Sequence, residues 1–172
     1  DSIVRTEHAH IPNNGIDMLI QERLSETKKH IRYVRGAAFA YYNEGKYSKA
    51  GSLFESLSVL TSGTERDDTV RYYWGLSNYK FKDYYTAETN LEKFIESYPR
   101  SPFASEARYL RLDCLYRSTL RYELDQTPTY KAIGAISEYI LEFPDNSHMQ
   151  ECRDALVELN KKALALGKNY KK

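Results

Sequence analysis

Several features that define large classes of proteins are scarce in this sequence of 172 residues. No run approaches the roughly 20 consecutive apolar residues of a membrane-spanning helix, and no charged head with an apolar signal core opens the chain. The two cysteines, Cys114 and Cys152, are too few for the disulfide framework of a small secreted domain. The 25 basic and 24 acidic side chains nearly cancel, which argues against nucleic acid or an anionic membrane as a partner.

Tyrosine, in contrast, is abundant, with 16 residues in the chain, whereas Gly and Pro together are few. Disordered chains are poor in aromatic side chains, so this composition predicts a folded protein. Most of the tyrosines are therefore expected to pack in a core or to bind a ligand.

The first 15 residues contain Pro12 and the run Asn13-Asn14-Gly15, which is turn chemistry without an apolar face. We expect residues 1–15 to be a mobile N-terminal segment. From Ile16 to Tyr41, apolar residues recur mostly at three-, four- and seven-residue intervals, which predicts one long helix or two nearly coaxial ones.

A short segment that ends in alanine and carries a large apolar residue four positions later occurs three times. Its alanines are Ala50, Ala87 and Ala132, and the large residues are Phe54, Leu91 and Ile136. The first step is 37 residues and the second 45, and Pro99 and Pro144 are also 45 residues apart. This pattern resembles the tetratricopeptide repeat, a helix-turn-helix of about 34 residues with small residues where its helices cross.

The sequence therefore predicts an all-α tetratricopeptide-repeat solenoid in a single domain over residues 16–172. Its expected units lie at about 31–63, 68–99 and 101–144, and a lone C-terminal helix follows at about 147–168. The third unit carries an insertion, residues 117–129, which accounts for its extra length. Cys114 and Cys152 fall too far apart along adjacent first helices to bond, and we expect them to be small buried residues.

Three stretches narrow the resemblance: residues 41–55, residues 94–102, and the insertion with its Leu124-Asp125-Gln126-Thr127 run. Together they resemble the BamD-type outer-membrane assembly lipoproteins, in the form of Bacteroides-like bacteria. The resemblance implies a periplasmic adaptor held to the outer membrane only by a lipidated cysteine, expected upstream of Asp1. It implies two kinds of protein partner, the barrel insertase and unfolded outer-membrane barrel precursors. Such proteins usually have about five repeats, so a C-terminal part is expected to be missing.

The resemblance to tetratricopeptide arrays also implies a concave groove lined by positions two, five, nine and twelve of each first helix. These positions fall on Arg32, Arg35, Phe39 and Tyr42 in the first unit, and on Thr69, Tyr72, Leu76 and Tyr79 in the second, with Lys80 adjacent. Such a groove suits a peptide that ends in an aromatic residue and a carboxylate. The alternative is that the rings only pack helix on helix and the basic residues are solvated.

Arg121, Leu124, Asp125 and Gln126 of the insertion are candidate partner-binding residues, although a carboxylate in a turn also commonly caps the chain. The lysines at 161–162 and 168–172 suit either anionic lipid or the dipole of a last helical turn. His8 and His10 lack a third metal ligand nearby, and we expect neither metal nor cofactor.

No phosphate-binding loop, nucleophile elbow or paired metal-binding histidines occur, so the sequence does not predict an enzyme. The alternatives to the adaptor are another cell-envelope scaffold, a sensory repeat domain, or a glycan-binding lipoprotein. The glycan binder would need exposed coplanar aromatic rings in a large insertion.

Overall fold

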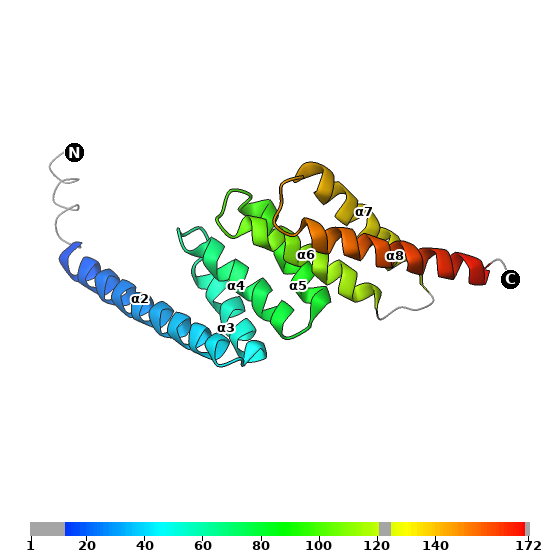
Figure 1. Ribbon diagram of the computed structural model, residues 1–172. Coiled ribbons are helices and arrows are strands. Elements are labelled where there is room, and N and C mark those ends of the chain that lie inside the picture. Colours follow the sequence, from blue (N-terminus) through cyan, green and yellow to red (C-terminus); the bar gives the residue numbers. More distant parts are fainter. Residues whose placement is uncertain (1–12, 121–124, 171–172) are drawn as a thin grey trace.

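The computed structural model describes residues 13–120 and 125–170, and these residues form helices and connecting turns without a strand (Figure 1). The helices follow one another as an array along the chain. They are α2 (Asn13–Asn43), α3 (Tyr47–Leu60), α4 (Asp67–Lys80), α5 (Tyr84–Ser97), α6 (Ala104–Thr119), α7 (Thr127–Glu142) and α8 (Met149–Tyr170). Three antiparallel helix pairs and a final helix confirm the predicted all-α repeat solenoid.

Helix α2 is a single helix of 31 residues, as its apolar periodicity predicts. Helix α2 begins at Asn13, so Asn13, Asn14 and Gly15 of the predicted N-terminal segment 1–15 are helical. Asn and Gly are weak helix formers, but each lowers helix stability by only about 1 kcal/mol, which a helix of this length can tolerate. Residues 1–12 lie outside the described part of the chain.

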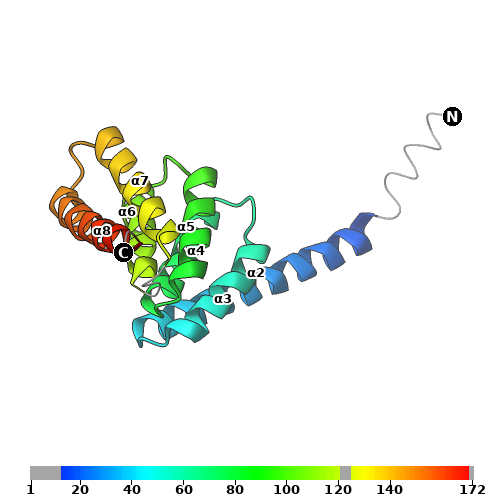
Figure 2. The same ribbon diagram turned by 90° about the vertical axis from the view of Figure 1, so that its right-hand side faces the viewer.

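The first half of α2 projects from the array, and both views show no described helix beside it (Figure 2). Its apolar side chains Ile16, Leu19, Ile20 and Leu24 are each at least half exposed. The same stripe continues into the core as Val34 and Ala38, where α3 packs against α2. Within the described residues, no helix is long and apolar enough to cross a membrane.

The turns that join the two helices of the first pair and of the second pair have the same geometry. Gly45 has a φ of 79° and Lys82 a φ of 67°, which is the left-handed region. In each turn the following residue donates its backbone N–H five positions back: Lys46 to the Tyr41 carbonyl at 2.9 Å and Asp83 to the Asn78 carbonyl at 3.0 Å. This is the Schellman arrangement that ends a helix and satisfies its last carbonyls.

Small residues lie where the helices cross. Ala38, Ala50, Ala87 and Ala132 are fully buried. Four positions after the last three alanines come Phe54, Leu91 and Ile136, which fill the adjacent core and are at most 2% exposed. Helices α5 and α7 end at Ser97 and Glu142, just before Pro99 and Pro144, because proline cannot continue a helix.

The third unit differs from the second in helix length. Helices α6 and α7 each have 16 residues, whereas α4 and α5 each have 14. The predicted insertion 117–129 is therefore partly helical, because α6 continues through Thr119 and α7 begins at Thr127. The residues at the end of α6 and the start of α7 are compatible with a helix, and Pro128 suits the first turn of α7. Cys114 and Cys152 are buried free thiols, as predicted.

Candidate protein-binding surface

The predicted groove positions can be followed through all four first helices, α2, α4, α6 and α8. Moving the first-unit set by 37 residues gives the second-unit set, and a further 37 residues gives Glu106, Tyr109, Asp113 and Tyr116 on α6. The 45-residue step then gives Glu151, Asp154, Glu158 and Lys161 on α8. Neighbouring sets touch, because the Tyr79 hydroxyl on α4 donates a hydrogen bond to the Asp113 carboxylate on α6.

Arg32 and Arg35 lie together at the N-terminal end of this face. They line a hollow of about 450 Å³ between α2 and the turn from α3 to α4. Two further cations, Lys28 and Arg66, share the hollow with a single carboxylate, Glu65, and Ile31 and Leu60 supply apolar surface. The hollow is therefore basic with apolar walls, a composition suited to a carboxylate attached to an apolar group.

The predicted aromatic groove residues Phe39, Tyr42 and Tyr72 belong to a packed cluster of rings. Phe39 meets both Phe54 and Tyr73 edge-to-face, with ring centroids 5.0 and 4.9 Å apart. Tyr72 stacks on Phe103 at 4.6 Å and is only 6% exposed, so it offers little surface to a ligand. Burial raises the pKa of both Tyr42 and Tyr72, as expected for phenols held in a core.

Leu76, Tyr79 and Lys80 occupy the last two turns of α4. Leu76 and Tyr79 are half-buried against the core of the second and third units, and Lys80 is exposed. Burial and the hydrogen bond to Asp113 raise the pKa of Tyr79. Thr69 lies half-buried in the first turn of α4. The candidate groove residues are thus divided between the basic hollow and the aromatic packing, and they do not converge on one pocket.

Of the insertion residues, Arg121 and Leu124 lie outside the described part of the chain. Asp125 accepts a hydrogen bond from the Thr127 backbone N–H at 2.9 Å, at the start of α7. Gln126 precedes the first residue of α7 and makes no side-chain cap there. Asp125 therefore satisfies one of the free N–H groups of the helix start, and partner binding by these residues stays a prediction.

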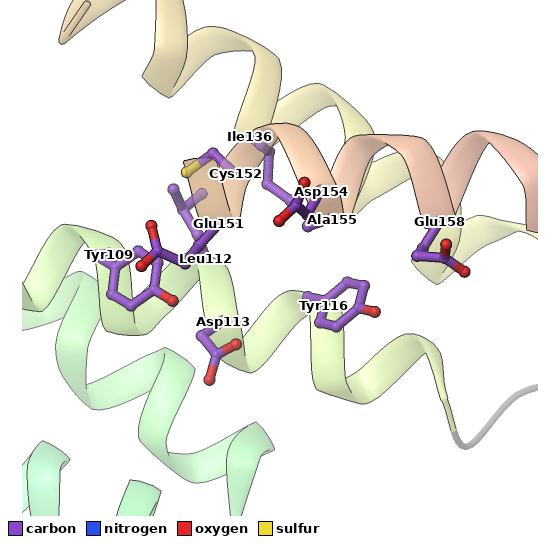
Figure 3. A pocket seen from close by; sticks show the side chains of 10 residues that line it. All are labelled: Tyr109, Leu112, Asp113, Tyr116, Ile136, Glu151, Cys152, Asp154, Ala155 and Glu158. Atoms are coloured by element: carbon purple, nitrogen blue, oxygen red, sulfur yellow. The ribbon is translucent and has the colours of Figure 1, made fainter. Parts of the chain in front are cut away.

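Helix α8 approaches α6 across a pocket that the sequence analysis did not assign (Figure 3). The pocket has a volume of about 260 Å³. Its acidic and aromatic lining comes from the groove positions of the two helices, namely Tyr109, Asp113, Tyr116, Glu151, Asp154 and Glu158. The sequence held the signal, since the 37- and 45-residue steps lead to these six residues.

The charge around this pocket is opposite to that of the basic hollow. Burial, with the negative charges of Asp113 and Glu151, raises the pKa of Tyr109 to about 12. His148, in the turn before α8, stacks on Tyr109 with centroids 3.6 Å apart and contacts the Glu106 carboxylate at 3.1 Å. Along the predicted groove positions and the two hollows beside them, the side chains therefore change from basic at α2, through aromatic at α4, to acidic at α6 and α8.

Other candidate sites have structural partners where the chain is described. Lys162 donates to the Thr119 carbonyl, so it complements the C-terminal end of α6, and Lys161 pairs with Glu158 at 3.5 Å. Among the described residues, no three His, Cys, Asp or Glu side chains gather in a way that could hold a metal ion. His8 and His10 lie outside that part of the chain.

The repeated helix pairs define an all-α protein of the tetratricopeptide class. The family model described as "YfiO: Outer membrane lipoprotein" matches residues 28–168, and the chain therefore belongs to this family.

Two curated relatives agree with this family. The outer membrane protein assembly factor BamD of Caulobacter vibrioides is 26% identical over 134 residues, which cover 76% of this chain and 44% of that protein. A putative outer membrane protein assembly factor BamD of Aquifex aeolicus is 35% identical over 123 residues, covering 70% of this chain and 40% of that protein. The predicted family resemblance is confirmed, and the chain spans less than half the length of either relative.

Proposed function

We propose that this chain is the helical-repeat part of a periplasmic lipoprotein adaptor that acts in the assembly of β-barrel proteins into the outer membrane. The observation that carries the proposal is the family match over residues 28–168. The names of the two curated relatives, an outer membrane protein assembly factor BamD and a putative one, support the same role. The adaptor works by binding proteins and catalyses no reaction. A lipid anchor holds the full-length protein at the periplasmic face of the outer membrane.

In this proposal the basic hollow is the first contact for an unfolded barrel precursor. Arg32 and Arg35 pair with a peptide carboxylate, and Ile31 with Leu60 receives the apolar or aromatic side chain next to it. The packed rings of Phe39, Tyr42 and Tyr72 contribute mainly by fixing the angle between α2 and α4. Leu76, Tyr79 and Lys80 continue the face toward α6.

A fluorescence titration tests the hollow. The probe is a labelled peptide of about ten residues with an aromatic residue and a free carboxylate at its C-terminus. Replacing Arg32→Glu together with Arg35→Glu should weaken binding at least tenfold. The matched control is Lys46→Glu with Lys49→Glu, two exposed lysines on the turn before α3 and on its first turn that change the net charge equally. Equal weakening in both variants would attribute binding to net charge and remove the hollow from the proposal.

A purification tests the partner. The full-length protein, isolated from its own envelope in mild detergent, should bring the barrel insertase with it in a fixed ratio. A lipoprotein of unrelated function, carrying the same affinity tag, serves as the control. Recovery of the protein without the insertase, from envelopes in which the insertase is abundant, would contradict the adaptor role.

The other classes raised by the sequence gain no support from the described residues. A glycan binder needs coplanar exposed rings, whereas the exposed aromatic residues are spread along the array: Tyr33 on α2, Phe81 and Tyr85 around the turn from α4 to α5, and Tyr130 on α7. The aromatic cluster at Phe39 and Tyr72 is packed mostly edge-to-face, apart from the stacked Tyr72–Phe103 pair.

A further inference from the structure

The pocket between α6 and α8 is separate from the basic hollow, because the two share no lining residue. Its apolar floor is made by Leu112, Ile136, Cys152 and Ala155. Tyr109 and Tyr116, two turns apart on α6, flank this floor on one side. Glu151 and Glu158, two turns apart on α8, flank it on the other (Figure 3).

The charge of the lining is one-sided. Four of the ten residues that line the pocket are carboxylates, and none of these ten described residues is Lys, Arg or His. Asp113 is engaged by Arg117 at 2.7 Å and by Tyr79. Glu158 pairs with Lys161 at 3.5 Å, Asp154 accepts a hydrogen bond from Gln150 at 2.9 Å, and Glu151 lies 4.0 Å from the His148 ring. Such exposed pairs contribute little to stability, so these carboxylates can exchange them for an incoming cation.

The size of the pocket limits what can enter. Sites for drug-sized ligands have volumes of roughly 300–1,000 Å³, and about 260 Å³ falls below that range. One apolar side chain of a protein fits this space better than a cofactor does. The two tyrosines suit a cationic neighbour, because Lys and Arg are attracted to aromatic faces as well as to carboxylates.

We propose that the α6–α8 pocket binds an extended, cationic segment of a partner protein, with one apolar side chain in the pocket and a Lys or Arg on each side of it. Glu151 and Glu158 are seven residues apart, which is about 10 Å along a helix. In an extended chain, residues i, i+2 and i+4 face the same side and span about 13 Å. Cations at i and i+4 therefore reach the two glutamates while the residue at i+2 enters the pocket.

Fluorescence anisotropy with two labelled peptides tests this site. The first peptide reads Gly-Ser-Arg-Ala-Leu-Ala-Arg-Ser-Gly, and the second has Glu in place of both Arg residues. The folded chain should bind the Arg peptide, and it should bind the Glu peptide at least tenfold more weakly. Raising the salt concentration should weaken binding of the Arg peptide, because exposed charges are screened.

The decisive variant is Glu151→Lys with Glu158→Lys, which should weaken binding of the Arg peptide at least tenfold. Its matched control is Glu55→Lys with Glu96→Lys, two exposed glutamates on α3 and α5 that change the net charge by the same amount. Both side chains of the decisive variant are more than half exposed, so the fold should persist, and circular dichroism checks it. Equal loss in the control would overturn the site in favour of general charge attraction.

The location of the peptide separates this inference from the proposed function. In a two-dimensional amide NMR spectrum, the Arg peptide should shift signals of α6 and α8 and leave residues 28–35 unchanged. The variant Arg32→Glu with Arg35→Glu should bind the Arg peptide as the unmodified chain does. Binding at the basic hollow, or unchanged binding after the two substitutions on α8, would overturn the proposal even if the adaptor role holds.

Discussion

The Tyr79 hydroxyl on α4 donates a hydrogen bond to the carboxylate of Asp113, which lies 34 residues later on α6. The same carboxylate accepts from the Arg117 guanidinium at 2.7 Å. Both residues occupy predicted groove positions, and their contact joins the first helices of the second and third units. It fixes the point where the aromatic part of the face meets the acidic part.

Removing this hydroxyl should loosen the junction between the two units. Tyr79→Phe keeps the packed ring but deletes a hydrogen bond to a charged group, which lowers the free energy of unfolding by about 1–2 kcal/mol. Denaturant unfolding measures the difference. Tyr85→Phe, at an exposed ring on α5, is the control and should stay within about 0.5 kcal/mol. A loss no larger than that of the control would show that the contact does not join the units.

Gly75 on α4 leaves no room for a side chain beside Leu91 of α5. A methyl group there would lie 2.9 Å from Leu91 Cδ2 and 3.1 Å from its Cγ, and Leu91 is fully buried. Gly75→Ala should therefore destabilise the chain by about 1–2 kcal/mol despite the better helix propensity of alanine.

Gly51→Ala on α3 is the matched substitution. Its methyl group would lie 3.5 Å from Asn78 Nδ2 and 3.6 Å from Ser77 Cβ, which is ordinary contact. This change should stabilise by up to about 1 kcal/mol through helix propensity. Thermal unfolding of the two variants should move in opposite directions, and a shift in the same direction would refute the close approach at Gly75.

Lys82 adopts the left-handed conformation that Gly45 adopts in the equivalent turn. A residue with a side chain loses about 1–2 kcal/mol there, whereas glycine loses about 0.5–1 kcal/mol through the entropy of the unfolded chain. Lys82→Gly should thus raise the free energy of unfolding by about 0.5 kcal/mol, and Gly45→Ala should lower it by about 1 kcal/mol. Urea titrations of both variants check the pair, and a stabilising Gly45→Ala would contradict the shared geometry.

The free energy of unfolding should fall as pH rises into the alkaline range, because two buried groups have raised pKa values. Burial raises the pKa of Cys114 from 9.0 to about 12, and burial with nearby carboxylates raises that of Tyr109 from 10.0 to about 12. A raised pKa means that the unfolded chain loses these protons first, so their contribution is complete below about pH 9 and is lost as pH rises toward 12. Stability measured at pH 8 and pH 10.5 should differ less in Cys114→Ala than in the unmodified chain. An equal difference in both would exclude Cys114 as a source of the effect.

The helices were predictable, because Pro99, Pro144 and the apolar periodicity of α2 act within one or two turns, and the recurrence of alanine at steps of 37 and 45 residues located the units. The extent to which each groove side chain is buried could not be predicted from these local features. Tyr72 lies at a groove position yet is buried, because Phe103 from the next unit stacks over it. That contact depends on the angle between units, which a single repeat does not encode.

The acidic and aromatic residues of the pocket could be located from the sequence, because they follow the same repeat register as Tyr72 and Tyr79. The predicted groove positions covered the first two units only, although a further 37-residue step leads to α6 and a 45-residue step leads from there to α8. The orientation of α8 relative to α6 depends on how the longer helices α6 and α7 pack. The spacing of residues in the sequence does not determine this packing. The hydrogen bond from Tyr79 to Asp113 could not be predicted either, because it also depends on how helices of neighbouring units pack.

Depletion of the full-length protein in its own organism tests the central claim most directly. The amount of folded, heat-modifiable β-barrel protein in the outer membrane is measured by gel shift, with an unrelated outer-membrane lipoprotein as the reference. The adaptor role predicts that folded barrels decline while the reference lipoprotein stays constant, and that the unmodified gene restores them. Unchanged levels of folded barrels after complete depletion would contradict it.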